Sequence, residues 1–121
     1  MKESLLIIDD EVEFAKMLAS FFRGKGYSVH ASTNLEDAIN IFRKEKPKVV
    51  LLDFNMPLVN GDKFLPILQN ILPTVRIIVV TGCQADEVEE RFKGLGYFAL
   101  FEKGGLSLET LKSKVDEAIR Y

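Results

Sequence analysis

Four short apolar runs in this chain each end abruptly at a polar residue whose side chain can take part in chemistry. The runs and the residues that follow them are 5–8 before Asp9 and Asp10, 49–52 before Asp53, 77–80 before Thr81, and 97–101 before Glu102 and Lys103. Uninterrupted apolar runs of four or five residues, separated by longer amphipathic segments, are typical of strands in a parallel sheet covered on both faces. The carboxyl ends of such strands share one edge, so we expect these polar groups to meet there in a single pocket.

The length and charge of the chain limit its class. Its 121 residues are enough for one domain with a substantial core, so we expect a single domain over residues 1–121. Sixteen Lys and Arg residues against eighteen Asp and Glu residues leave a net charge of -2, which gives no electrostatic indication of nucleic-acid binding. The single Cys83 excludes an internal disulfide, and no apolar run approaches the roughly 18 to 20 residues of a membrane span. With no room for a signal peptide before the first strand, we expect a cytoplasmic protein without membrane contact.

The amphipathic segments between the apolar runs predict helices. Helices are expected at 12–22, at about 63–71 and at 84–93. A further helix should run from a capping box at Thr33 and Glu36 to Pro47, and the last one should follow an N-cap at Ser107. Strands are also expected at 27–31 and 75–80. Five strands and five helices in strict alternation predict a doubly wound α/β fold with one parallel sheet, for which the flavodoxin-like order 2-1-3-4-5 is a common solution. The strand at 27–31 is the most polar, which indicates a place at an edge of the sheet.

Two of the expected helices have unusual sequences. A proline is tolerated in a helix only near the first turn, so the helix that contains Pro66 should start late or kink there. The helix at 84–93 is charged and has few apolar anchors, Val88 and Phe92 being the clearest, so we expect it to be loosely held. The segment at 54–61, with its Met-Pro and Asn-Gly pairs, is expected to form a loop.

The polar residues at the strand ends indicate phosphoryl chemistry with a metal ion. Three carboxylates, those of Asp9, Asp10 and Asp53, would repel one another unless a cation lay between them. Two carboxylates and a backbone carbonyl, completed by water, are a common way to hold Mg²⁺. The Lys103 ammonium and the Thr81 hydroxyl would then contact the oxygens of a phosphoryl group. Asp53, at the centre, is the expected nucleophile, because aspartyl phosphate formation is a known form of carboxylate catalysis.

These positions, together with the segment DFNMPLVNG at 53–61 and the Thr-Gly pair at 81–82, resemble the receiver domain of bacterial two-component response regulators. The resemblance covers the whole chain, and it implies a phosphorelay signalling switch rather than an enzyme. By that resemblance Asp53 accepts a phosphoryl group from the phosphohistidine of a histidine kinase or phosphotransfer protein. Thr81 and Lys103 contact the phosphoryl group and couple it to a movement that changes a surface for a downstream protein.

The same resemblance assigns the metal ligands. Asp10 and Asp53 would ligate Mg²⁺ directly, Asp9 would act through water, and Asn55 would contribute its main-chain carbonyl. The chain ends one helix beyond Lys103, so we expect no DNA-binding or catalytic output module on it, and it is either a stand-alone receiver or a piece of a longer regulator or hybrid kinase. The cognate kinase and the downstream target are not readable from the sequence.

Two positions depart from the pattern of the family. The family usually has a proline after the conserved lysine, whereas glycines at 104–105 follow Lys103. Three residues before the lysine the family commonly has a Tyr or Phe that swings inward on activation, and this chain has Leu100 there, next to Phe101. A movement that couples Thr81 to an aromatic rotamer is therefore not expected.

Other functions fit the residues less well. A haloacid-dehalogenase-type phosphatase needs a second aspartate two residues after the nucleophile, where Asn55 cannot act as an acid or a base. A flavin or nucleotide binder needs a first loop that cradles phosphate, whereas Asp9, Asp10 and Glu11 are acidic. A degenerate receiver that binds partners without phosphorylation is a further alternative, which retention of phosphate on Asp53 would exclude.

The individual residues also have plain structural interpretations. Asp9 and Asp10 could serve only as favourable charges at a helix N-terminus. Asp53 and Thr81 could be turn residues, and Lys103 a solvated lysine. The joint pattern favours the functional interpretation, because five separated positions agree in residue type, order and place at a strand end.

Overall fold

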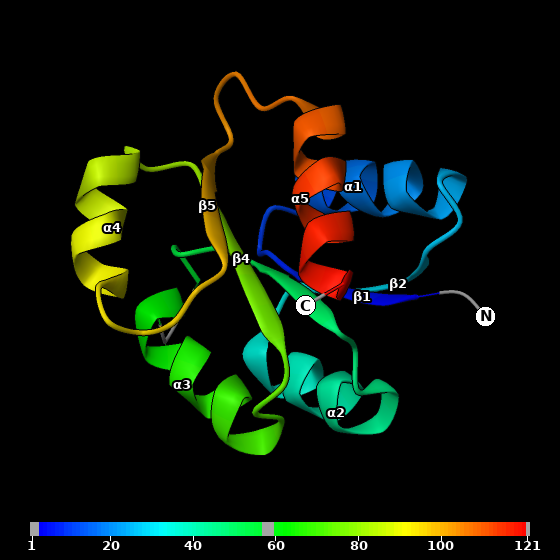
Figure 1. Ribbon diagram of the computed structural model, residues 1–121, viewed down its shortest axis with the longest axis horizontal. Helices are drawn as coiled ribbons and strands as arrows, with labels where there is room; N and C mark the ends of the chain where they lie inside the picture. Colours follow the sequence, from blue (N-terminus) through cyan, green and yellow to red (C-terminus); the bar gives the residue numbers. More distant parts are fainter. Residues whose placement is uncertain (1–2, 57–59, 121) are drawn as a thin grey trace.

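Five parallel strands alternate with five helices along the described chain, and the helices lie on both sides of the sheet (Figure 1). The computed structural model describes residues 3–56 and 60–120. In chain order the elements are β1 (Ser4–Ile8), α1 (Val12–Gly24), β2 (Ser28–Ser32), α2 (Leu35–Glu45), β3 (Val49–Leu52), α3 (Gly61–Ile71), β4 (Arg76–Thr81), α4 (Ala85–Phe92), β5 (Ala99–Glu102) and α5 (Leu108–Arg120). The sheet order is β2-β1-β3-β4-β5 and every neighbouring pair is parallel, which confirms the predicted doubly wound α/β fold.

Alternation of side chains along the strands gives the sheet two separate cores. On β1, Leu6 and Ile8 belong to one core, while Leu5 and Ile7 belong to the other. Helices α2, α3 and α4 cover the first face, and α1 and α5 cover the second (Figure 1). Each of the first four helices buries one phenylalanine completely: Phe22, Phe42, Phe64 and Phe92. Burial on both faces explains why the strands are continuous apolar runs.

The strand boundaries follow pairing rather than hydropathy. The apolar run at 97–101 predicts a strand, but β5 begins only at Ala99, where pairing with Ile78 of β4 starts. Before it, the Phe98 N–H donates to the Ile77 carbonyl at 2.7 Å. Strands β2 and β4 each lie one residue further along the chain than predicted. The edge position of β2 is confirmed.

The N-terminus of α2 differs from the prediction. The capping box at Thr33 and Glu36 is wrong, because the N-cap is Asn34, whose side-chain oxygen accepts the Asp37 N–H at 2.8 Å. Asparagine is as good an N-cap residue as serine or threonine, so sequence preference does not decide between adjacent candidates. The path of the chain out of β2 decides which residue caps α2. There the Ser32 hydroxyl donates to the Asn34 carbonyl at 2.8 Å.

Helix α3 begins at Gly61. The late start that Pro66 suggested is therefore wrong. The reason is the contact of Gly61 with the chain that follows β3: its N–H donates to the Phe54 carbonyl at 2.8 Å. Pro66 lies inside the helix and is exposed. The carbonyl that loses its helical partner there is that of Asp62, four residues earlier. A kink at Pro66 stays a prediction. Of the predicted loop at 54–61, residues 57–59 lie outside the described part.

The remaining helices follow their predicted patterns with one exception. In α1 the sequence predicts an apolar stripe that includes Met17, but Met17 is 41% exposed, and the buried residues are Ala15, Leu18, Ala19 and Phe22. In α4 the buried residues are Val88 and Phe92, as predicted. The predicted cap of α5 is confirmed, since the Ser107 hydroxyl oxygen accepts the Thr110 N–H at 3.2 Å.

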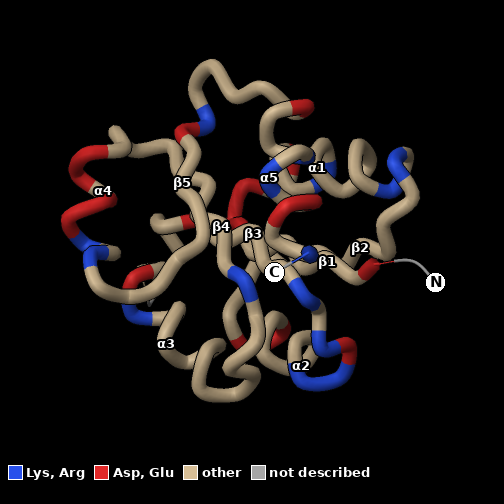
Figure 2. Tube along the Cα trace, in the orientation of Figure 1, with Lys and Arg blue, Asp and Glu red and all other residues tan. Residues whose placement is uncertain are grey.

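Charge is distributed unevenly over the molecule (Figure 2). Acidic residues gather on α4 and around the carboxyl edge of the sheet. Lys46, Lys48 and Arg76 line a cavity of about 360 Å³ at the opposite, amino-terminal edge. Among the described residues, none of the helices combines the length and the apolar character that crossing a bilayer requires.

Candidate functional site

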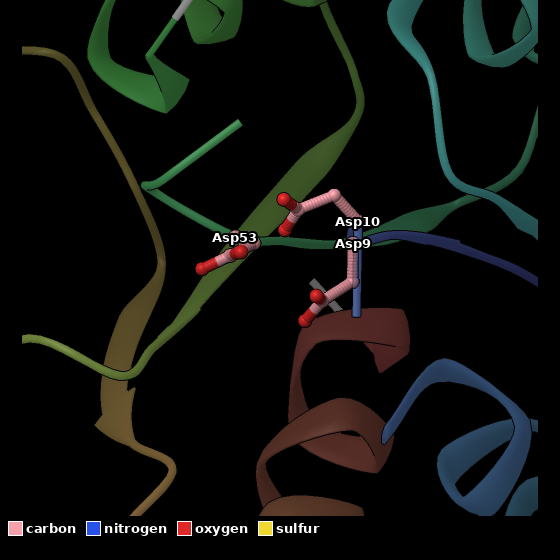
Figure 3. A group of neighbouring side chains, drawn as sticks. All are labelled: Asp9, Asp10 and Asp53. Carbon is pink, nitrogen blue, oxygen red and sulfur yellow. The ribbon is translucent and has the colours of Figure 1, made fainter. Parts of the chain in front are cut away.

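Three carboxylates meet at the carboxyl edge of the sheet (Figure 3). Asp9 and Asp10 follow β1, and Asp53 follows the neighbouring β3, held in place by its N–H, which donates to the Ile8 carbonyl at 3.0 Å. One oxygen of each carboxylate lies within 4.8 Å of the others. Asp9 and Asp53 are 2% and 3% exposed, whereas Asp10 is exposed. We call Asp9, Asp10 and Asp53 the acidic site.

Lys103 supplies the positive charge of the acidic site. Its ammonium lies 2.9 Å from Asp9 Oδ2 and 3.7 Å from Asp53 Oδ2, and it also pairs with the Glu11 carboxylate. The aromatic ring of Phe14 lies against it, with its centroid 4.5 Å from Nζ. The Lys103 side chain is only 11% exposed, so it is not the solvated lysine of the plain structural interpretation.

The pKa shifts at the acidic site have clear causes. Burial and then the Asp9 charge raise the pKa of Asp53 to about 7, against the lowering effect of Lys103. Burial also raises the pKa of Asp9, although the hydrogen bond from Lys103 opposes it. Burial of Lys103 disfavours its charge, but hydrogen bonds to Asp9 and Glu11 outweigh that and raise its pKa. Two buried carboxylates therefore share one ammonium, which leaves excess negative charge for a further cation.

The residues present fit a divalent metal ion. Among the described residues, Asp53 Oδ1 is buried and has no hydrogen-bond partner, although a buried carboxylate oxygen normally has one. Three carboxylates at this spacing are the oxygen donors that hard cations prefer. The acidic site is therefore consistent with a metal site. The side-chain amide of Asn55 donates to Cys83 Sγ at 2.9 Å, and a role for its main-chain carbonyl stays a prediction.

Thr81 lies at the end of the neighbouring strand β4 and is fully buried. Its hydroxyl oxygen accepts the Cys83 N–H at 3.0 Å, and its carbonyl accepts the Lys103 N–H at 2.7 Å. Thr81 is thus bonded both to the connection that leads to α4 and to the lysine of the acidic site. The structure brings all the predicted polar groups to one edge of the sheet, as the strand-end pattern indicated.

Three contacts at this edge were not predicted from the sequence. Glu11 and Phe14 both face Lys103, and Glu102 accepts the Ala85 N–H at 2.5 Å. The position of Glu11 next to two aspartates was a usable signal, because the chain there must turn into α1 beside the site. No signal in the sequence pairs Glu102 with α4.

The residues that depart from the family pattern have ordinary packing. Leu100 is partly buried in the core beneath α4, and Phe101 packs on the opposite face of the sheet. Neighbouring side chains of a strand point to opposite faces, so Phe101 cannot take the place of Leu100. Gly105 has φ of +73°, a conformation that glycine adopts easily.

The fold and the acidic site define a class: doubly wound α/β proteins with carboxylates and a lysine at the carboxyl edge of the sheet. The response regulator receiver domain family matches residues 5–116. The chain belongs to this family, and it is therefore a signalling receiver domain.

Individual relatives agree with that assignment. The chain is 31% identical over 103 residues to sporulation initiation phosphotransferase F of Bacillus subtilis, covering 85% of this chain and 83% of that protein. It is 33% identical to the probable transcriptional regulator ycf27 of Guillardia theta over 78% of this chain, but it spans only 36% of that longer protein. A CheY-like receiver domain from Methanospirillum hungatei superposes with a TM-score of 0.91 at 21% identity, over 99% of this chain and 95% of that one, which shows the shared fold.

Proposed function

We propose that this chain is a phosphorelay switch in which Asp53 accepts a phosphoryl group from the phosphohistidine of a histidine kinase or phosphotransfer protein. An oxygen of the Asp53 carboxylate forms a bond to phosphorus as the phosphorus–nitrogen bond breaks, and the imidazole leaves with the bonding electron pair. The observation that carries this proposal is the Asp53 carboxylate itself, which is buried beside two other carboxylates and lies 3.7 Å from an ammonium.

The neighbouring residues have distinct roles in this proposal. Asp10 and Asp53 would hold Mg²⁺ directly, Asp9 would act through water, and the main-chain carbonyl of Asn55 would complete the protein ligands. When bound, Mg²⁺ neutralises the charge that develops on the phosphoryl oxygens. The buried acidic site otherwise repels an incoming phosphate anion, which makes the cation a requirement.

Thr81 and Lys103 hold the phosphoryl group. The ammonium of Lys103 already lies beside Asp53, so it reaches a phosphoryl oxygen with little movement. The Thr81 hydroxyl can donate to another oxygen, and the β4–α4 connection to which it is bonded would respond.

The proposal extends to the partners of the chain. Residues 1–121 act as one receiver domain in the cytoplasm, without direct nucleic-acid contact. A histidine kinase or phosphotransfer protein donates the phosphoryl group, and a downstream protein binds the altered surface. The relative in Bacillus subtilis, a sporulation initiation phosphotransferase, supports partners of this kind.

The test is phosphorylation by acetyl phosphate followed by intact-mass spectrometry. We expect one labile phosphoryl group in the presence of Mg²⁺, and none in the presence of a chelator or in Asp53→Asn. Asp62→Asn, which changes another buried aspartate, should be labelled like the wild type. If Asp53→Asn keeps the label, Asp53 is not the nucleophile, and if the wild type is never labelled, the chain is a degenerate receiver.

A further inference from the structure

The carboxylate of Glu102 connects the end of β5 to the beginning of α4. Its Oε1 accepts the Ala85 N–H at 2.5 Å, and Ala85 is the first residue of α4. The first backbone N–H groups of a helix have no partner within the helix, and the N-cap residue Gln84 makes no side-chain bond to them. Glu102 therefore acts for α4 as an N-cap side chain normally does, although it comes from another element.

The same end of β5 is bonded to the acidic site. Glu102 lies opposite Thr81 in the pairing of β4 with β5, and the N–H of the next residue, Lys103, donates to the Thr81 carbonyl at 2.7 Å. The Lys103 ammonium in turn lies 2.9 Å from Asp9 Oδ2. One short segment thus contacts the acidic site through Lys103 and α4 through Glu102.

Helix α4 has few other attachments that could hold it in one position. Its eight residues bury only Val88 and Phe92. Asp86 and Glu87 in its first turn place two more negative charges near the Glu102 carboxylate, in the acidic region over α4 (Figure 2). These like charges oppose the approach of the Glu102 carboxylate to the start of α4.

The packing beneath α4 includes Leu100 at the place where the family commonly has an aromatic residue. Leu100 lies in the core that contains Val88 and Phe92, and its aliphatic side chain has no ring to turn between a buried and an exposed position. A hydrogen bond depends on distance and direction, whereas aliphatic packing tolerates small shifts. Among the described residues, the hydrogen bond that joins β5 to α4 is the one that Glu102 accepts.

We propose that the Glu102–Ala85 bond holds α4 in place in the unphosphorylated protein, and that its loss transmits phosphorylation to α4. This inference rests on the proposed phosphoacceptor role of Asp53. A phosphoryl group on Asp53 attracts the Thr81 hydroxyl and the Lys103 ammonium. Thr81 lies opposite Glu102 on the neighbouring strand, and Lys103 follows Glu102 in the chain. The displacement of Thr81, which pairs with Glu102 across the two strands, breaks the bond to Ala85. A contact made only in the unphosphorylated state favours that state, so its removal favours the phosphorylated one.

The first experiment needs no phosphate. Hydrogen exchange and amide chemical shifts are compared in the wild type, Glu102→Ala and Glu90→Ala, the last removing the same charge from an exposed position of α4. In Glu102→Ala we expect faster exchange of the Ala85 amide and shifts of the α4 amides toward those of the beryllofluoride-bound wild type. Glu90→Ala should resemble the wild type. Unchanged exchange of the Ala85 amide in Glu102→Ala overturns the proposal.

The second experiment measures affinity for beryllofluoride, a phosphoryl mimic, with Mg²⁺ present. We expect Glu102→Ala to bind it roughly 2- to 10-fold more tightly than the wild type, because a helix cap that opposes the change has been removed. Glu102→Gln, which keeps an acceptor oxygen, should lie between them. A cap with only a structural role would lower stability and leave this affinity unchanged, which overturns the inference alone. If the wild type binds no beryllofluoride, the phosphoacceptor role itself fails.

Discussion

The ammonium of Lys103 lies closer to Asp9 than to Asp53, at 2.9 Å from Asp9 Oδ2 and 3.7 Å from Asp53 Oδ2. The Lys103 side chain is 11% exposed and the side chains of both aspartates are 3% exposed, so these charges interact with little solvent between them. Lys103 therefore neutralises part of the charge that a metal ion would neutralise. A cation bound at the acidic site would compete with the lysine for these carboxylates, while a phosphoryl group would attract both.

The first prediction concerns this competition. Lys103→Ala should bind Mg²⁺ at least as tightly as the wild type, because a competing charge is gone. It should bind beryllofluoride at least about tenfold more weakly, because a charge-assisted hydrogen bond is lost. Titrations of Mg²⁺ and beryllofluoride give the two affinities, with Lys112→Ala, whose ion pair with Asp116 lies on α5, as control. A large loss of Mg²⁺ affinity in Lys103→Ala would show a structural role instead.

The second prediction is the pH dependence of stability without metal. The pKa of Asp53 is about 7 in the folded protein and lies near 3.8 in the unfolded chain. Between these two pH values Asp53 is therefore protonated more in the folded state than in the unfolded state. The free energy of unfolding should therefore fall as pH rises from about 4 to about 7, by at most about 1.4 kcal/mol per pH unit from this group. Urea denaturation in a chelator at several pH values measures it. Asp53→Asn should flatten the dependence, and an equally steep profile in that variant would contradict the assignment.

The third prediction concerns Asp10, the exposed member of the acidic site. Asp10→Asn should lower Mg²⁺ affinity on the order of tenfold or more, because it removes a charged ligand. Its effect on the free energy of unfolding should be within about 0.5 kcal/mol, since the side chain is exposed. The matched control is Asp86→Asn in α4, which should leave Mg²⁺ affinity unchanged. Equal affinities in the two variants would exclude Asp10 as a ligand.

The fourth prediction concerns the close approach of Gly61 to the chain at Asp53. A Cβ at Gly61 would lie 2.7 Å from the Asp53 carbonyl oxygen, so the backbone of the acidic site would have to shift. Gly61→Ala should lower the free energy of unfolding by about 1–3 kcal/mol. Gly24→Ala, where a Cβ meets nothing within 4 Å, should be neutral or stabilising by up to about 1 kcal/mol. Urea denaturation compares them, and equal stabilities would contradict the contact.

The fifth prediction tests the cap of α2. Asn34→Ala should cost about 1 kcal/mol of unfolding free energy, because the Asp37 N–H loses its acceptor. Thr33→Ala should change it by less than about 0.5 kcal/mol, since Thr33 is exposed and is not the N-cap. Thermal or urea unfolding of both variants is sufficient. The reverse order of effects would restore the capping box that the sequence suggested.

The sheet and the acidic site could be predicted because their signals are local. Runs such as 49–52 are apolar at every position because both faces of the strand are buried, and Asp53 stands where that burial ends. The flavodoxin-like strand order, which the alternation of strands and helices predicted as a common solution, then places Asp53 beside Asp9. The roles of Thr81 and Lys103 on a phosphoryl group, and of Asn55 as a ligand, stay predictions.

The sequence by itself determined the order of strands and helices, the two-sided burial of the sheet and the edge at which the polar groups gather. Only the tertiary structure decided that Asn34 rather than Thr33 caps α2, that α3 starts at Gly61, and that Glu102 caps α4. The physical reason is that hydrophobic periodicity reports which face of an element is buried. A hydrogen bond between residues distant in sequence depends instead on positions that are fixed only when the elements pack together.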